Sequence, residues 1–304
     1  MSGKITGSAK LNASSEEDEA PQPLYAAPAL DKGLDILELL SRQDGGLTRR
    51  DIAERLGRSV SEVFRMIECL ARRSYLVQTG DTYALGMRLF ELAHEFPPMN
   101  RLLKEALPRM EALAKAVGQS CHLTVLSGPR QIVVAQVDPP EGMGFSIKIG
   151  TVLELLKSAS GRVLLAFQDE EEVRRLLLLA EPEAVAADRT ATFRSIAKVA
   201  AQGFAFMRSN QFSGLEAISY PVLDLRGRAI AALTVPYVKR LDDPTRMSPA
   251  DAQAALAATV ADLNAALGGT VGDPSRAKGP VGPPSRAKAP VMPRRSPSAS
   301  RVRP

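Results

Sequence analysis

Side chains suited to catalysis or metal binding are scarce in this sequence. Its 304 residues include two histidines, His94 and His122, and two cysteines, Cys69 and Cys121. A nucleophile with its base, or a zinc site, needs several such groups at fixed spacings. Cys121 and His122 are neighbours, and neighbouring side chains of a strand point to opposite faces. We therefore expect no catalytic residue, no metal and no cofactor, and we interpret His122 as a structural histidine.

A second group of functional side chains is basic and lies between Leu47 and Arg73. This segment holds seven arginines against four acids. Arginines and small hydroxyl side chains on one helix face are suited to phosphates and base edges in a DNA major groove. The candidate DNA contacts are Thr48, Arg49, Arg50, Arg58, Ser59, Ser61, Glu62, Arg65 and Arg72.

Two short amphipathic helices joined at Gly57 would position these residues as a helix-turn-helix. Thr48 can cap the first helix, and Ser59 or Ser61 the second. Gly57 can end the first helix because it adopts backbone angles that other residues resist. In the second helix, Ser61, Arg65, Glu68 and Arg72 share a polar face opposite Val63, Met66, Ile67 and Leu70.

The flanking residues favour a winged domain over a simple helical bundle with a solvated charged face. Residues 75–77 and 82–85 predict two strands around a turn at 79–81, which is a hairpin of the wing type. Upstream, residues 29–40 predict a third helix. Its core residues are expected to be Leu34, Ile36, Leu37 and Leu40.

Composition sets the wider organisation. A hydrophobic content of 45% and a length of 304 residues are sufficient for about two domains. Neither a run of 18 apolar residues nor an apolar signal core at the N-terminus is present. We expect a cytoplasmic protein without a membrane partner.

Both ends of the chain have compositions that cannot build a core. Residues 1–28 are rich in Ser, Glu, Pro and Ala, and residues 270–304 in Pro, Gly, Lys and Arg, so both segments are expected to be disordered. Eight Lys or Arg against one Asp give this tail a charge of +7, which leaves −2 for the rest of the chain. The tail is expected to add non-specific affinity for DNA, and the alternative is an idle solvated tail.

After Cys121 the pattern changes to strands interspersed with helices, which predicts an α+β domain with an antiparallel sheet. The predicted strands are 122–126, 131–137, 145–149, 204–207, 217–223 and 229–235, and the predicted helices are 158–167, 170–179, 193–202 and 249–267.

The sequence resembles the IclR family of bacterial transcription regulators. In the first domain the resemblance rests on residues 29–40 and 46–70, on Tyr75-Leu76, and on Gly80, Tyr83 and Leu85-Gly86. In the second domain it rests on Gly150-Thr151, Leu153, residues 158–162, Leu165-Ala166, residues 203–205, Gly214-Leu215, Ile218 and Pro221-Val222.

This resemblance implies a winged helix-turn-helix over 29–85, linker helices over 86–117 and a GAF-like effector-binding domain over 118–269. It also implies double-stranded operator DNA and a small-molecule effector as partners, and a homodimer or homotetramer. The implied effector contacts are Phe145, Ser158, Ala159, Ser160, Gly161, Met207, Ala217 and Thr234.

The start of the helix at Ser158 offers free N–H groups between small side chains, which suits a carboxylate. The alternative is that Ser158 is a simple N-cap. With apolar side chains such as Met207 beside it, we expect a small organic acid with an apolar body. Two other classes stay open, namely an enzyme with an accessory winged domain and an architectural DNA-binding protein without a ligand.

Overall fold

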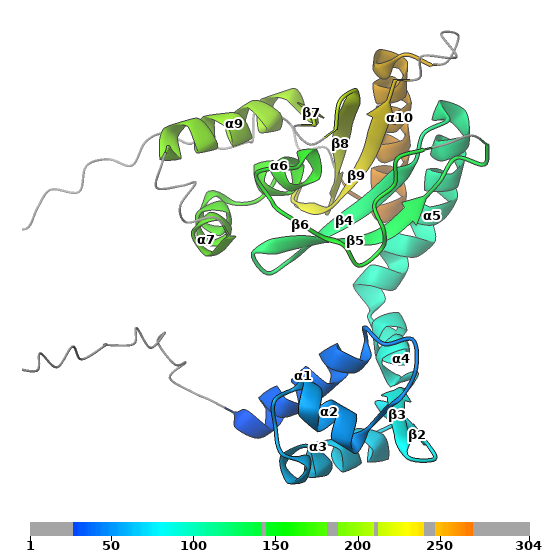
Figure 1. The fold of residues 1–304 in the computed structure, drawn as a ribbon. Helices are drawn as coiled ribbons and strands as arrows, with labels where there is room; N and C mark the ends of the chain where they lie inside the picture. Colours follow the sequence, from blue (N-terminus) through cyan, green and yellow to red (C-terminus); the bar gives the residue numbers. More distant parts are fainter. Residues whose placement is uncertain (1–26, 142–143, 181–187, 210–211, 240–246, 270–304) are drawn as a thin grey trace, which may run out of the picture. The chain divides into compact units, whose positions relative to one another are not determined.

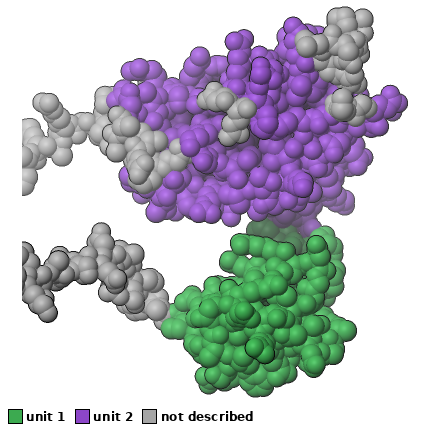
Figure 2. Space-filling model, in the orientation of Figure 1, with its two compact units in different colours: residues 1–96 green, residues 97–304 purple. Residues whose placement is uncertain are grey.

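The computed structural model describes residues 27–141, 144–180, 188–209, 212–239 and 247–269. The predicted disorder of residues 1–26 and of the basic tail 270–304 therefore lies outside the described residues. The chain divides between Phe96 and Pro97 into two compact units (Figure 2), and each is described by itself.

The first unit is a winged helix-turn-helix (Figure 1). Its small sheet has the order β1-β3-β2 and is antiparallel, so the wing hairpin β2–β3 gains a third strand just before the first helix of the motif. The elements are α1 (Pro28–Leu40), β1 (Leu47–Thr48), α2 (Arg49–Arg55), α3 (Val60–Arg72), β2 (Leu76–Thr79), β3 (Thr82–Leu85) and α4 (Arg88–Glu95).

The core of this unit joins the three predicted helices to the wing. Ile36, Ile52, Ile67 and Tyr83 are completely buried, and Leu76 is almost so. The prediction that Leu34 joins this core was wrong, because 47% of its surface is exposed. Two residues along a helix turn through about 200°, so Leu34 and Ile36 cannot share a face.

The second unit is built on a six-stranded antiparallel sheet of order β6-β5-β4-β9-β8-β7. Its strands are β4 (Cys121–Ser127), β5 (Arg130–Val137), β6 (Val152–Leu153), β7 (Ala205–Arg208), β8 (Leu215–Leu223) and β9 (Ala229–Val238). Its helices are α5 (Pro97–Val117), α6 (Ala159–Ala166), α7 (Glu170–Ala180), α9 (Arg189–Gln202) and α10 (Pro249–Leu267).

The helices lie on both faces of this sheet (Figure 1). Helices α5 and α10 bury one face in a core that includes Met110, Leu123, Ile218 and Leu233. Helix α6 covers the other face, with α9 and α7 packed beyond it. Helix α5 is therefore part of the second unit, and it can begin at Pro97 because proline is well suited to the first turn of a helix.

The predicted strand at 145–149 was wrong. The edge strand is instead β6, paired with Gln131 and Ile132 of β5. The N–H of Gly150 already donates to the carbonyl of Val133 at 2.8 Å, and the carbonyl of Thr151 accepts from the N–H of Val133 at 3.0 Å. The edge of β5 is thus occupied from Gly150 onwards.

The α+β fold class is confirmed, with a mostly helical winged unit followed by an antiparallel sheet between helices. Among the described residues, every helix is too short or too polar to cross a membrane.

Candidate DNA-binding and effector-binding sites

Capping boxes fix the beginnings of both helices of the helix-turn-helix. Ser59 caps α3, since its hydroxyl accepts from the N–H of Glu62 at 3.3 Å while Glu62 Oε2 accepts from the N–H of Ser59 at 3.0 Å. Thr48 and Asp51 form the same arrangement at α2. Gly57, with φ of 61°, makes the turn between the helices. The hydroxyls of Thr48 and Ser59 are thus engaged within the protein.

Two of the predicted contacts join the turn and α3 to α1. Glu62 Oε1 lies 2.9 Å from Lys32 Nζ, and Arg58 Nη2 donates to Asp35 Oδ2 at 2.7 Å. The pKa of Glu62 is lowered to about 2, chiefly by the backbone N–H of Ser59 and then by Lys32. Glu62 is therefore an ionised carboxylate that is bonded to residues of its own unit. These bonds orient α3, and the charge of Glu62 is paired with Lys32 instead of being free beside DNA phosphates.

Arg49 joins α2, α3 and the wing. Its Nε donates to Tyr83 Oη at 2.8 Å, and its guanidinium carbon lies 4.9 Å from the centre of the Phe64 ring. Its Nη2 is 3.7 Å from a carboxylate oxygen of Glu68. The charge of Arg49 is thus largely satisfied inside the unit.

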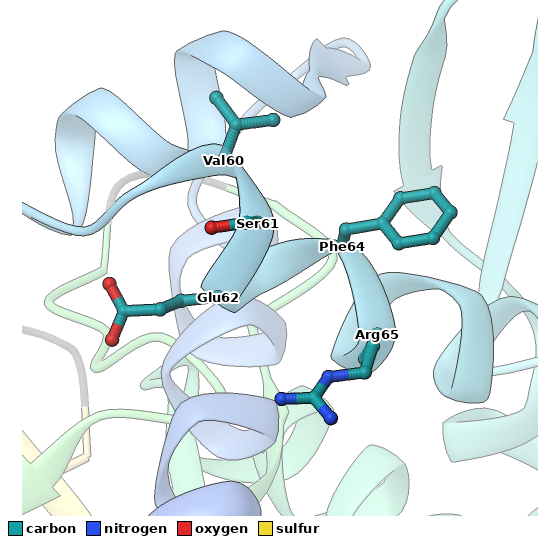
Figure 3. A pocket seen from close by; sticks show the side chains of 5 residues that line it. All are labelled: Val60, Ser61, Glu62, Phe64 and Arg65. Atoms are coloured by element: carbon teal, nitrogen blue, oxygen red, sulfur yellow. The ribbon is translucent and has the colours of Figure 1, made fainter.

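The remaining predicted contacts, Arg50, Ser61, Arg65 and Arg72, are exposed. Ser61 and Arg65 lie at a shallow hollow on the outer side of the first two turns of α3, with Val60, Glu62 and Phe64 (Figure 3). Among the described residues, Arg65 makes no hydrogen bond or ion pair. An exposed, unpaired guanidinium beside a helix N-terminus is suited to bind phosphate or a base edge.

Val60 and Phe64 also belong to this face, although neither was predicted as a DNA contact. They are 47% and 40% exposed. At about 100° per residue they lie at the border of the apolar stripe, so periodicity alone assigns them to neither side. Their shared i, i+4 spacing on a helix start was the signal available.

In the second unit, a row of polar side chains crosses the sheet on the face covered by α6. His122 is opposite Thr234, Thr234 is opposite Ser219, and these three side chains are buried. The hydroxyl of Thr234 donates to Ser219 Oγ at 2.8 Å. In the next row, Met207 is opposite Ala217. The structure thus brings three predicted effector contacts, Met207, Ala217 and Thr234, beside two residues that were not predicted as contacts, His122 and Ser219.

His122 differs from an ordinary structural histidine. Its Nδ1 is buried and has no hydrogen-bond partner among the described residues, and burial lowers its pKa from 6.5 to about 4. Buried polar atoms normally have a partner, so this nitrogen is an unmet hydrogen-bonding group. The signal in the sequence was weak, because register between distant strands cannot be read from local spacing.

The start of α6 lies over the same face of the sheet. Ser158 is the N-cap, since its hydroxyl accepts from the N–H of Gly161 at 3.1 Å, donates to the carbonyl of Glu154 at 2.8 Å and accepts from Gln131 Nε2. Ala159 packs in one cluster with Met207 and Ala217. Ser160 is buried, and its hydroxyl makes no hydrogen bond to any described residue.

Gly161 and Phe145 were also predicted as effector contacts. Gly161 is tightly enclosed, because a Cβ would lie 2.2 Å from the carbonyl oxygen of Leu155. Phe145 lies away from regular structure and packs edge-on against Phe212, with ring centres 5.1 Å apart. Among the described residues, no group of three or more His, Cys, Asp or Glu could hold a metal.

Comparisons with known proteins agree with both units. The IclR helix-turn-helix domain matches residues 29–80, and the bacterial transcriptional regulator IclR C-terminal domain matches residues 99–262. The HTH-type transcriptional regulator BhcR of Paracoccus denitrificans is 29% identical over 213 residues, which are 68% of this chain and 76% of BhcR.

Solved structures show the same fold. The crystal structure of Pseudomonas aeruginosa HmgR has a TM-score of 0.61 and 26% identity, covering 78% of this chain and 98% of HmgR. An IclR homolog from Microbacterium hydrocarbonoxydans, complexed with 4-hydroxybenzoate, has a TM-score of 0.65 and 23% identity, covering 79% and 98% of the two chains. The two domain matches together span most of the described residues, and the chain therefore belongs to the IclR family of bacterial transcription regulators, with a DNA-binding helix-turn-helix.

Proposed function

We propose that this regulator binds operator DNA through the exposed side of α3 and that a small organic acid, bound over the α6 face of the sheet, controls that binding. The proposal of a bound organic acid rests on the buried polar row of His122, Thr234 and Ser219, in which His122 Nδ1 has no partner among the described residues. Burying polar groups is costly unless they are hydrogen-bonded, and a ligand would supply the missing partner.

On the DNA side, we assign two roles to the predicted contacts. Arg50, Ser61, Arg65 and Arg72 are exposed and are the proposed direct contacts. The remaining five orient the helices, because their side chains cap the two helices or bond to other elements of the unit. They are Thr48, Arg49, Arg58, Ser59 and Glu62.

On the effector side, the chemistry of the row suggests which groups the ligand carries. Hydroxyls such as those of Ser160 and Ser219 can donate to a carboxylate. His122 is neutral near pH 7, because its pKa is about 4, so it offers one donor and one acceptor and suits a hydroxyl better than a second anion. Met207 and Ala217 offer an apolar wall. A hydroxylated aromatic or aliphatic acid meets these demands.

The first probe is 4-hydroxybenzoate, which combines a carboxylate, an apolar ring and a hydroxyl. A panel of small hydroxy acids and the matching acids without hydroxyl would be screened by thermal shift, since a ligand of the folded state raises its stability. Compounds that stabilise the protein would then be added to operator-binding titrations, with operator fragments selected from the source genome.

The site would be tested with Thr234→Val, which removes one hydroxyl at constant shape. We expect it to weaken the effector response while operator affinity without effector stays unchanged. The matched control is Thr259→Val in α10, whose hydroxyl bonds to Ala255 O at 2.9 Å on the opposite side of the sheet. If both variants respond like the wild type, the effector binds elsewhere, and if no compound changes operator binding, effector control itself is refuted.

We further propose that the effector is bound and not transformed. The pKa of the Cys121 thiol is raised to about 12 by burial, so this cysteine is a poor nucleophile. Recovering the probe unchanged after long incubation with the protein is the expected result, and any product formed in proportion to the amount of protein would refute it.

We also propose that two copies of this chain, which contact each other through α4, bind the operator together. None of the residues of α4 is buried, and Leu89, Phe90 and Leu92 are all exposed. Large apolar side chains exposed on one short helix are expected at an interface, and symmetric pairing would present two α3 helices to successive major grooves.

A further inference from the structure

We propose that Val60 and Phe64 contribute to operator specificity by contacting the 5-methyl groups of thymines. This inference rests on the proposed DNA interface and adds a base preference to it. Thymine is distinguished in the major groove by its methyl group, and apolar side chains are the ones that contact it.

The position of the two side chains supports this role. Both belong to the first two turns of α3, in the hollow that also contains Ser61 and Arg65, and Figure 3 shows Phe64 and Glu62 leaving the helix on opposite sides. The polar groups of this face are thus bordered by apolar surface on the Phe64 side. N-terminal residues of a recognition helix are the ones that reach base edges in related architectures.

Phe64 is also held in place, as a side chain that reads a base must be. The Arg49 guanidinium covers its ring at 4.9 Å from the ring centre, and Arg49 is in turn fixed by Tyr83, which is completely buried. An exposed phenylalanine pinned in this way leaves 40% of its surface open. Exposure of this apolar surface to water is unfavourable in free energy, and contact with a methyl group would remove the surface from solvent.

The experiment replaces thymine by deoxyuridine, which removes only the methyl group. The probe is the shortest genomic fragment that the protein protects, carrying uracil at one thymine at a time. Burial of one methyl-sized group is worth a factor of about four in affinity at 25 °C, so we expect a loss of about fourfold at one or two positions of each half-site.

The variants Val60→Ala and Phe64→Ala identify the reader. At the sensitive positions, each is expected to bind the thymine and uracil probes with more nearly equal affinity. Leu34→Ala is the matched control, because Leu34 is 47% exposed on α1 and outside the hollow, and it should keep the full fourfold difference. Val60→Ala leaves the Arg49–Phe64 contact intact, so the test survives if Phe64→Ala unfolds.

Two results would overturn the inference while leaving DNA binding in place. One is an operator that tolerates uracil at every thymine. The other is an equal loss with uracil in the wild type and in the folded variants, which would mean that the methyl groups act through DNA shape. Failure of the wild type to bind any fragment would instead refute the proposed DNA interface.

Discussion

His122 should make the stability of the second unit fall between pH 7 and pH 5. Burial lowers its pKa from 6.5 to about 4, so the unfolded chain binds a proton at a pH where the folded unit does not. The stability that this neutral histidine preserves is fully present above pH 6.5 and is lost as the pH falls towards 4. The direction follows from the lowered pKa alone.

The magnitude follows from linkage. With the two pKa values above, the free energy of unfolding should drop by about 2 kcal/mol between pH 7 and pH 5, and by about 3 kcal/mol once both states are fully protonated. The exposed carboxylate Glu62 also has a lowered pKa, about 2, but it titrates below this window and belongs to the first unit.

The assay must separate the two units, because a chain with two units need not unfold in one step. Urea titrations at pH 7, 6 and 5 would be followed by a pulse of hydrogen exchange at one fixed pH and by mass spectrometry of peptides from β4 and α3. Peptides from β4 should lose stability with acid. Protein concentration stays constant throughout, since association also changes stability.

The chain contains its own control, because it has two histidines. His122→Phe should flatten the pH dependence of the β4 peptides, whereas His94→Phe, at an exposed position of α4, should leave it as in the wild type. An equal pH dependence in the wild type and the folded His122→Phe variant would refute the reasoning.

Three further predictions concern packing, DNA and assembly. Gly161→Ala should destabilise the second unit by about 1–3 kcal/mol in urea titrations, because its Cβ would lie 2.2 Å from a carbonyl oxygen. Gly33→Ala in α1 is the control, because its Cβ would meet nothing within 4 Å, and it should be neutral or stabilising. Arg65→Ala should weaken operator binding by about 1–3 kcal/mol in binding titrations. The control Arg130→Ala, on a hairpin of the second unit, should leave operator affinity unchanged. If a folded Arg65→Ala variant binds the operator as tightly as the wild type, Arg65 is not part of the interface. In analytical ultracentrifugation, Phe90→Glu should lower the mass of the sedimenting species towards the 32.6 kDa of a single chain. An unchanged mass would show that α4 is not the interface.

Local patterns were sufficient to predict the winged unit. Thr48 was predicted to cap the first helix and Ser59 or Ser61 the second, and Thr48 and Ser59 form capping boxes. Gly57 was predicted to end a helix, and its φ is positive. Such features depend on residues within one or two turns of each other, which is why they can be read directly from the sequence.

The roles of the charged residues in that unit could not be predicted in the same way. Arg49, Arg58 and Arg65 are alike in the sequence, yet Arg49 bonds to Tyr83, Arg58 bonds to Asp35, and Arg65 pairs with none of the described residues. The partners of the first two are 34 and 23 residues away. Whether an arginine holds its own fold or is free for phosphate thus depends on tertiary contacts rather than on residue type.

The proposed effector site was still harder to predict from the sequence. His122 reads as a structural histidine because nothing near it in the sequence has ligand spacing, and its neighbour Thr234 is more than a hundred positions away. Their pairing exists because β9 lies between β4 and β8 in the sheet, an order that leaves sequence neighbours apart and brings His122, Thr234 and Ser219 into one row. Since each of these strands also has an apolar face buried under α5 and α10, a shift by one residue would turn the polar row into that core and would turn the apolar residues towards α6. The packing of the opposite face thereby fixes the register that assembles the polar row.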